Sequence, residues 1–520
     1  MSGANPQTLI GMGAYLLAMI AIGLWYARRS NSNLEEYFLA KRSFGPWVAA
    51  ISAEASDMSG WLLMGLPGVA YFTGLGEAFW TALGLFIGTW INWALVAKRL
   101  RSYSQIADNA ITLPEFFSKR FHDKKRILLA IAAIISLVFF SIYVGAQFIT
   151  FGKLFSNLFG ANQVVMVILG AVLVMLYTLL GGFWAVGMTD LIQGLLMVTA
   201  LVLVLAFGIV HAGGFAGVAE NLKNFPHFLD FFGTAAPKMA DGAQSVVNGV
   251  PVFSGEGTKY SLLTIISTMA WGLGYFGMPQ VLVRFMAINK TSNIRRSRNI
   301  AVIWCFIAQL AAVGIGLVGR ALNPASFGTG SDSESIFILL SQGFFPPLLA
   351  GIVISGILAA SMSSSDSYML IVSSSLANDI FKDIFKKDAS EALVMWVARL
   401  TMLLVTVFGV IIAVSGNQSI FRVVSYAWAG LGASFGPLIL FSLFWKRTTF
   451  PAAVAGVLSG GIMVALWKNV IAKLGGIFDV YELLPAFVIS SLVIFLVSLA
   501  TKQPGPEIEA EFEQAKTAEF

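Results

Sequence analysis

The chain has 520 residues, of which 57% are hydrophobic and only 12% charged, whereas soluble domains are about half apolar and about a quarter charged. Its mean hydropathy of +0.80 predicts a membrane protein and excludes a separate catalytic domain. The net charge of +6 does not indicate a nucleic-acid partner, because the basic residues lie in short loops between apolar runs. The single cysteine permits no internal disulfide.

Thirteen apolar runs are long enough to cross a bilayer, at about 20 residues per helix. No basic segment precedes the first run, so we interpret it as a retained helix and not as a removable signal peptide. The predicted fold is an all-α membrane protein with a single membrane domain over 1–500. We expect a solvated acidic cytoplasmic tail over 501–520 and no regulatory domain. The predicted spans are 7–27, 45–72, 76–97, 127–152, 163–184, 188–212, 260–286, 299–320, 345–376, 394–415, 423–445, 451–470 and 482–500.

The distribution of Lys and Arg between alternate loops predicts the orientation, because cytoplasmic loops are enriched in them. The loops after the odd-numbered spans, together with the tail, hold about 24 of the 33 Lys and Arg residues, and the opposite loops hold about 8. We therefore expect the N-terminus outside and the C-terminus in the cytoplasm. The expected location is the plasma membrane, which is the inner membrane of a bacterium.

The second predicted span contains an acid among helix breakers. Asp57 and Gly60 lie within the span, and Pro67 and Gly68 follow within two turns. An ionised Asp near the bilayer centre costs at least about 2.5 to 3.5 kcal/mol, so we expect Asp57 to face a cavity or a cation. The alternative is a structural carboxylate bonded to Ser or backbone amides. Glu54 is interpreted either as a group of an external cavity or as a helix cap.

The seventh predicted span repeats this pattern between Trp271 and Gln280, where three glycines and Pro279 weaken an α-helix. Backbone groups freed inside a bilayer are tolerated only where they line a cavity or bind something. Spans 2 and 7 are five apart, so they begin two five-span units of opposite orientation, over about 45–212 and about 260–445. Interrupted helices at matching positions of inverted repeats are typical of a secondary transporter's binding site.

The ninth predicted span supplies hydroxyl groups. Ala360, Ser363 and Ser364 are related by three and four residues and therefore share one helical face. Hydroxyl and carbonyl oxygens suit a hard cation such as Na⁺, although small residues also favour close helix packing in membranes. Asp366, two residues further on, favours an ion pathway.

The residues described in spans 2, 7 and 9 resemble those of the sodium/solute symporter family. The resemblance rests on the stretches 56–68, 271–279 and 425–430, and it extends over nearly all the predicted spans. It implies the leucine-transporter fold, in which spans 2 to 11 form the 5+5 inverted repeat, and Na⁺-coupled symport by alternating access. The stretch 56–68 resembles the family members that carry L-proline. The implied ligands are thus L-proline and Na⁺, with no nucleic acid and no obligatory protein partner.

The resemblance also implies roles for single residues. Asp57 matches an acid needed for sodium-dependent transport, and Asp190 matches a position linked to sodium release or to a second sodium site. Asp366 stands where some relatives with two sodium sites carry Ser, so we favour one Na⁺ per substrate. The implied sodium ligands are Ala55, Met58, Ala360, Ser363 and Ser364. The implied substrate-binding residues are Tyr143, Trp271, Tyr275, Pro279, Ser59 and Gly60.

Three other functions are weighed against this one. The same fold and coupling would also serve another small amino or carboxylic acid. A membrane-embedded solute sensor would call for a fused signalling domain, and an ion channel is disfavoured by the inverted helix breaks. We expect no enzymatic activity, because His122, His211 and His227 form no metal or triad spacing.

Overall fold

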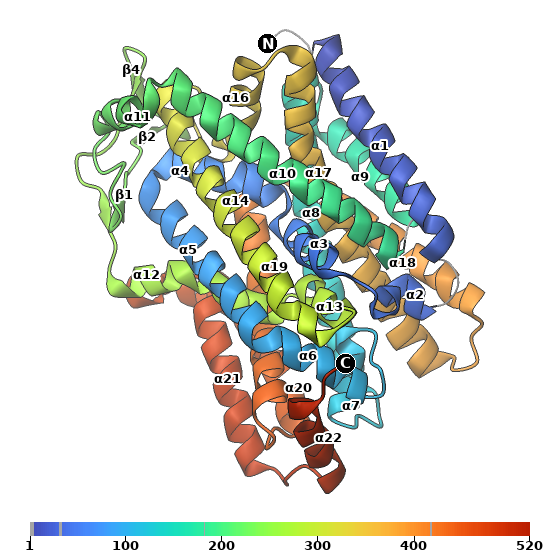
Figure 1. Ribbon diagram of the computed structural model, residues 1–520. Helices are drawn as coiled ribbons and strands as arrows, with labels where there is room; N and C mark the ends of the chain where they lie inside the picture. Colours follow the sequence, from blue (N-terminus) through green and yellow to red (C-terminus); the bar gives the residue numbers. More distant parts are fainter. Residues whose placement is uncertain (1–4, 31–33, 181, 417–418) are drawn as a thin grey trace.

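The computed structural model describes residues 5–30, 34–180, 182–416 and 419–520. Within them the protein is a bundle of long helices with three small antiparallel strand pairs in one loop (Figure 1). Ten helices of this part are long and apolar enough to cross a membrane, and a helix pair bent by 44° adds an eleventh span. A multi-pass helical membrane protein is therefore confirmed.

The remaining two predicted spans correspond to the helical segment 46–73 and to the shorter apolar helix α9. The long helices and their direct continuations are α1 (Pro6–Ser30), α3 (Pro46–Gly60), η2 (Trp61–Gly65), α4 (Leu66–Thr73), α5 (Leu75–Ile91), η3 (Asn92–Val96), α6 (Ala97–Ile106), α8 (Ile127–Phe159), α9 (Gln163–Leu180), α10 (Phe183–His211), α12 (Leu262–Met269), η4 (Ala270–Gly277), α13 (Pro279–Ala287), α14 (Ile294–Leu322), α17 (Pro347–Ser374), η6 (Ser375–Phe385), α18 (Glu391–Val414), α19 (Ile420–Phe444), α20 (Phe450–Leu466), η7 (Trp467–Ile471) and α21 (Leu483–Ala500).

Shorter elements connect these helices. They are α2 (Leu34–Leu39), η1 (Ala40–Arg42), α7 (Leu113–Arg120), α11 (Gly214–Lys223), η5 (Thr291–Asn293), α15 (Gly330–Ser333), α16 (Ile336–Phe344), η8 (Ala472–Leu474), η9 (Gly476–Phe478) and α22 (Pro506–Thr517). The strand pairs are β1 (Gly233–Thr234) with β6 (Thr258–Lys259), β2 (Met239–Ala240) with β3 (Ala243–Gln244), and β4 (Val246–Val247) with β5 (Val250–Pro251).

The helix that begins at Pro46 is interrupted at Ser59, as its polar and small residues predict. Ser59 has φ +51° and ψ −173°, which no α-helix accommodates, and the chain continues through the wider turn η2 into α4. Glycine is required at the next position, because a Cβ on Gly60 would lie 2.6 Å from the side chain of Thr150 in α8.

The second interruption lies between η4 and α13. Met278 is extended, with φ −82° and ψ 106°, and Pro279 occupies the first turn of α13. Proline suits this position because the first amides of a helix have no partner inside it. The prediction of a broken helix is confirmed here as well.

The two interrupted helices cross near the middle of the bundle. α13 packs against α3, and α5 and α19 pack along η4. α10 and α17 cover the other sides of α3, so the break at Ser59 is enclosed by helices far apart in sequence (Figure 1). One large apolar cluster runs through these helices and excludes water from the breaks.

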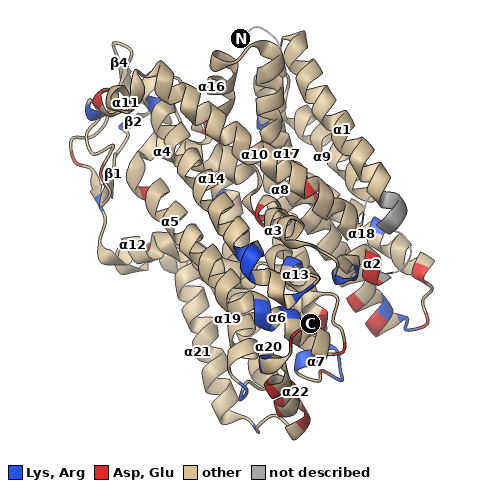
Figure 2. Ribbon diagram, viewed as in Figure 1, with Lys and Arg blue, Asp and Glu red and all other residues tan. Residues whose placement is uncertain are grey.

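Most side chains of the tail 506–520 are exposed or half-buried, but one face of its helix is docked on the bundle. α22 packs against α6, and Phe512 is only 3% exposed. Phe512 and Ala515 are three residues apart and form the buried face of α22, while Glu507 and Glu513 are exposed. Figure 2 shows that this helix lies at the end of the bundle where Lys and Arg gather around α6, α7 and α13.

Candidate functional site

The two helix breaks are joined by a hydrogen bond. Gln280, in the first turn of α13, donates from Nε2 to Oδ1 of Asp57 at 3.0 Å. Asp57 is 3% exposed, and the hydroxyl of Tyr143 donates to its carbonyl oxygen at 3.2 Å. The Tyr143 ring lies 4.5 Å from that of Tyr368 in α17. The structure therefore brings Asp57 and Tyr143 together at the break.

The backbone groups freed at Ser59 have side-chain partners. The Gly60 amide donates to Oε1 of Gln147 in α8 at 3.1 Å, and the Trp61 amide donates to the Ser59 hydroxyl at 3.2 Å. Both groups lie inside the bundle, where an unpartnered amide would cost several kcal/mol. Gln147 thus compensates for the helical hydrogen bonds lost at the break.

The same compensation occurs at the second break. The Trp271 carbonyl accepts a hydrogen bond from Nε1 of Trp428 at 2.8 Å, and the Tyr275 carbonyl accepts one from Nδ2 of Asn92 at 2.9 Å. Because both carbonyls are taken by side chains of other helices, η4 is fixed between α5 and α19. Pro279 lies just beyond this segment, at the start of α13.

Three of the five predicted sodium ligands are in contact. The Ser363 hydroxyl lies 2.9 Å from the Ala55 carbonyl oxygen and 3.1 Å from that of Ala360. The Ser364 hydroxyl is buried and has no hydrogen-bond partner among the described residues. The Met58 carbonyl accepts a hydrogen bond from the Trp61 amide. The result is a buried group of oxygens where α17 passes the end of α3.

An aromatic cluster covers the break on one side. The Trp271 ring lies 5.4 Å from Trp61, 5.3 Å from Phe421, 5.3 Å from Tyr481 and 6.2 Å from Trp428. Trp428 also packs edge-on against Tyr275, at 5.1 Å. Trp271 and Tyr275 therefore share Trp428 as a neighbour.

A cavity of about 800 Å³ lies next to this aromatic cluster. It is bounded by α4, α5, α12, the segment 329–334, the start of α19 and the connection 468–482, and Trp271 and Phe421 contribute to its wall. The wall carries both signs of charge, with Glu77 and Asp479 as well as Arg422. A small polar solute can therefore approach the aromatic cluster from this side.

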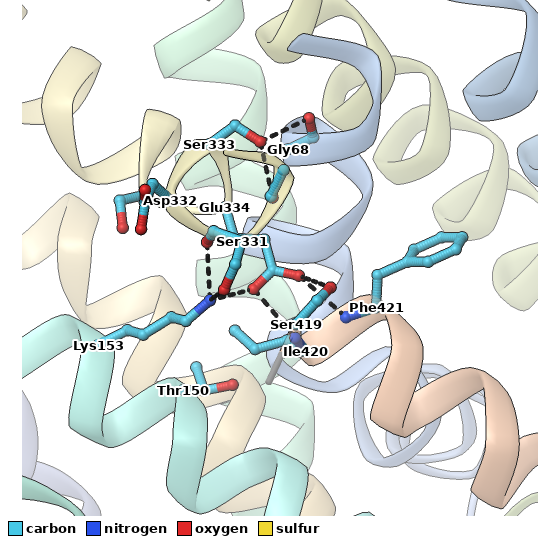
Figure 3. A network of polar contacts seen from close by, with 12 residues as sticks. Gly68, Thr150, Lys153, Ser331, Asp332, Ser333, Glu334, Ser419, Ile420 and Phe421 are labelled. Atoms are coloured by element: carbon cyan, nitrogen blue, oxygen red, sulfur yellow. Dashed lines mark hydrogen bonds and ion pairs between the residues drawn. The ribbon is translucent and has the colours of Figure 1, made fainter. Parts of the chain in front are cut away.

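A buried ion pair closes the rim of this cavity (Figure 3). Lys153 of α8 pairs with Glu334, whose carboxylate also accepts hydrogen bonds from the amides of Ile420 and Phe421 at 3.0 and 3.1 Å. The carboxylate thus stabilises the positive N-terminal end of α19. Ser333, next to Glu334, donates to the Gly68 carbonyl of α4 at 3.0 Å. These contacts join α4, α8 and α19 at one end of the site.

The opposite side of the break is closed by a polar network around Arg284 of α13. Its guanidinium bonds Asp190 of α10 at 3.0 Å, the Ser52 hydroxyl of α3 at 2.9 Å and the Ser367 hydroxyl of α17 at 2.6 Å. Ser367 in turn donates to Asp366 at 3.4 Å. The structure therefore brings the predicted coupling residues Asp190 and Asp366 together. On α17 this network lies one turn after Ser363, and on α3 it lies one turn before Ala55.

The sequence leaves the role of Glu54 open between a cavity group and a helix cap, and among the described residues it is found in neither place. Glu54 is buried beside Nε1 of Trp93 at 3.4 Å, and it neither lines the outer cavity nor caps a helix. α3 turns this side chain towards η3, away from the cavity.

Several polar residues at the site are not among the predicted ones. A charged or amide side chain inside an apolar span signals a functional position, and the sequence gives that signal at Gln147, Gln280 and Arg284, whereas Lys153 and Glu334 lie outside the predicted spans. These residues are Gln147, Lys153, Gln280, Arg284 and Glu334.

A model of the sodium:solute symporter family matches residues 37–460 of the chain. The chain belongs to this family. It is 40% identical over 502 residues to the osmoregulated proline transporter OpuE of Bacillus subtilis, covering 96% of each chain. It is also 40% identical over 515 residues to the sodium/proline symporter of Salmonella typhimurium, covering 98% of this chain and 96% of the relative.

Solved structures share the fold of this family member. A Na⁺-coupled sialic acid symporter in a substrate-bound, outward-open state superimposes with a TM-score of 0.74 at 20% identity, over 96% of this chain and 99% of its own. MhsT in complex with L-phenylalanine superimposes with a TM-score of 0.52 at 15% identity, over 87% of this chain and 98% of its own. The overall helix arrangement is thus that of a transporter fold.

Replacing Arg284 with Gln should destabilise the protein, because the buried Asp190 carboxylate would lose its cationic partner. Breaking one partner of a buried pair costs about 3 to 5 kcal/mol, and thermal unfolding of the purified protein in detergent measures the loss. The double variant Arg284→Gln with Asp190→Asn should recover part of it, because no unpaired charge then remains in the pair. Arg295→Gln, at an exposed position of α14, serves as the control. Equal stability of Arg284→Gln and the wild type would contradict the pairing.

Proposed function

We propose that the protein is a Na⁺-coupled symporter that imports L-proline by alternating access. Relatives named as proline transporters match almost the whole length of the chain at 40% identity, which supports this substrate. The observation that carries the mechanism is the hydrogen bond between Gln280 and Asp57, because it links the two helix breaks through which ion and solute would act on each other.

In this proposal the helical membrane domain has thirteen spans. The segment α3–η2–α4 and the bent pair α12–η4–α13 are the first helices of two inverted five-span repeats, over about 45–212 and about 260–445. The two interruptions at Ser59 and Met278 support the pairing of these segments, since each falls near the middle of its helix.

The proposed sodium site lies between the end of α3 and α17. Carbonyl oxygens of Ala55, Met58 and Ala360 and the hydroxyls of Ser363 and Ser364 would bind the ion, since Na⁺ prefers such neutral oxygens. The short distances from the Ser363 hydroxyl to the Ala55 and Ala360 carbonyls support a site of this size. The unpartnered Ser364 hydroxyl supplies a further oxygen.

Three carboxylates would couple the ion to the conformational change. Asp57 lies beside the break and would hold the unwound segment in the form that binds Na⁺. Asp190 and Asp366, joined through Arg284 and Ser367, lie on the route by which the ion would leave. Because Arg284 already supplies a cation to this pair of acids, we propose one Na⁺ per substrate.

The proposed substrate site lies between the breaks. Tyr143, Trp271 and Tyr275 would enclose the apolar pyrrolidine ring and attract its ammonium group through their aromatic faces. The carboxylate would bind backbone amides at the broken helices, around Ser59 and Gly60 and at the turn before Pro279. The cluster of rings around Trp271 supports this placement.

Alternating access would use the closures on either side of the breaks. The aromatic cluster separates the breaks from the cavity of about 800 Å³, and the Arg284 network closes the other side. Na⁺ and proline are coupled if each binds the same conformer preferentially. Bound Na⁺ would favour the conformer that is open to the outer cavity.

We place the protein in the plasma membrane, the inner membrane of a bacterium, with the end that holds α6, α7 and residue 520 in the cytoplasm. The gathering of Lys and Arg at this end supports the orientation (Figure 2). The cavity and the strand pairs then face outward.

Uptake of labelled L-proline into liposomes that contain the purified protein tests the function. An inward Na⁺ gradient should drive accumulation above equilibrium, and a K⁺ gradient of the same size should not. A folded protein that accumulates no proline, but does accumulate another small amino or carboxylic acid, would change the substrate and leave the coupling intact. Accumulation without Na⁺ dependence would overturn the coupling.

Replacing Asp57 with Asn tests its role in sodium dependence. The amide keeps the size of the side chain but removes its charge, so we expect the Na⁺ concentration for half-maximal uptake to rise about tenfold or more, which is a change of 1.4 kcal/mol or more. Glu54→Gln is the matched control, because it neutralises another buried acid of α3 that faces Trp93. An unchanged Na⁺ dependence of Asp57→Asn would remove Asp57 from the coupling.

Replacing both Ser363 and Ser364 with Ala should abolish the stimulation of proline binding by Na⁺, because two proposed ligands are lost together. Equilibrium binding of labelled proline with and without Na⁺ measures this effect. The control replaces Ser373 and Ser374 with Ala, since in the part of the chain that the structure describes these hydroxyls donate to carbonyls of their own helix, at 2.9 and 2.8 Å. Normal stimulation in the first double variant would show that its hydroxyls only pack.

A further inference from the structure

Residues 506–520, called the C-terminal strap below, lie across the basic end of the bundle. α22 makes the first part of the strap and packs along α6, and the last residues continue past α6 to η5. Figure 2 shows the acidic stretch of α22 at this basic end, and Glu509 and Glu519 form ion pairs with Lys446 and Lys98. The strap therefore contacts membrane helices that are remote from it in sequence.

Phe512 anchors the strap. Its ring lies 6.3 Å from that of Tyr103 in α6 and 5.5 Å from the guanidinium carbon of Arg120 in α7. Arg120 is fully buried, and its two Nη atoms have no hydrogen-bond partner in the described part of the chain. A buried cation of this kind depends on aromatic faces for its stabilisation. Phe512 is thus part of the environment that holds the Arg120 side chain of α7 against α6.

The end of the strap is held by backbone hydrogen bonds. The Ser102 hydroxyl of α6 donates to the Ala518 carbonyl at 2.9 Å, and the Thr291 amide of η5 donates to the Phe520 carbonyl at 2.8 Å. The ion pair between Lys98 and Glu519 is exposed and contributes little in comparison. The strap therefore joins α6 to the turn between α13 and α14.

Two further contacts extend this link. Glu511 lies 3.1 Å from Nε2 of His122, just after α7, and Glu509 lies 3.7 Å from Nζ of Lys446, in the turn between α19 and α20. The strap thus touches four segments of this end: α6, the end of α7, η5 and the α19–α20 turn.

Two of these segments, α6 and α7, pack against α13 of the second broken helix, and η5 follows α13 in the chain. α13 carries Arg284 and ends at Ala287, four residues before Thr291. Any conformation in which α13 moves away from its neighbours must stretch or release the strap, because the strap binds both η5 and the segments around it.

We propose that the C-terminal strap is an intramolecular latch that holds this end of the transporter closed and slows its opening. The latch rests on the proposed alternating-access function.

Two variants release the strap. Phe512→Asp places a charge in the buried contact while keeping the chain length, and a stop codon after Gly505 removes the strap altogether. The control is Glu513→Gln, because the hydrogen bonds and ion pair of the neighbouring Glu513 within the described chain are to Lys516 of its own helix. The truncated protein keeps the test valid if Phe512→Asp fails to insert into the membrane.

The first measurement is hydrogen–deuterium exchange of the full-length protein and its variants in lipid nanodiscs. Both released forms should exchange about fivefold or more faster over 97–123 and 287–300, a typical size for coupling between two sites. The control should match the wild type. Unchanged exchange in these two ranges would overturn the latch.

The second measurement is the efflux of labelled proline from preloaded liposomes down its own gradient. The released forms should empty the liposomes about fivefold or more faster than the wild type. Faster exchange without faster efflux would overturn the latch and leave the strap as a packing element. Faster exchange in a protein whose wild type moves no proline at all would instead overturn the proposed substrate, and the latch would be tested again with the solute that is carried.

Discussion

The structure depends on one constraint: a backbone group released inside a bilayer must find another partner, because no water is present to replace the lost hydrogen bond. Both broken helices obey it. The amide of Gly60 is bonded by Gln147, and the carbonyl of Tyr275 is bonded by Asn92. Each partner belongs to a different helix, so the breaks exist only in the assembled bundle.

The same requirement explains how charges are distributed across the site. Arg284 bonds Asp190 and two hydroxyls, and at the other end Lys153 bonds Glu334, so that each of these four buried charges has a counter-charge from a part of the chain distant in sequence. Contacts that close one side of a transporter must be stable in one conformation and must break in the other. Ion pairs between segments distant in the sequence can do both. The two pairs lie on opposite sides of the Asp57–Gln280 contact, where the two sides of the membrane would be closed in turn.

Much of the architecture is predictable from local sequence. Apolar runs separated by basic turns identify the helices, and the clustering of Gly and Pro predicts both breaks, because these residues weaken a helix whatever surrounds them. The common face of Ala360 and Ser363 follows from helical spacing alone. Family membership is evident from the motif around Asp57.

Other features required the tertiary structure. The sequence marks Asp57 as an acid inside a span, but its partner Gln280 lies 223 residues further on, and no local pattern pairs the two. Glu54 looks equally suited to a cavity, yet α3 turns it towards Trp93. The acidic composition of 506–520 indicates a solvated tail, whereas the spacing of Phe512 and Ala515 lets it dock on α6. Local propensities thus determined where helices form and break. Long-range packing decided which polar groups meet, because each contact depends on helices brought together only by folding.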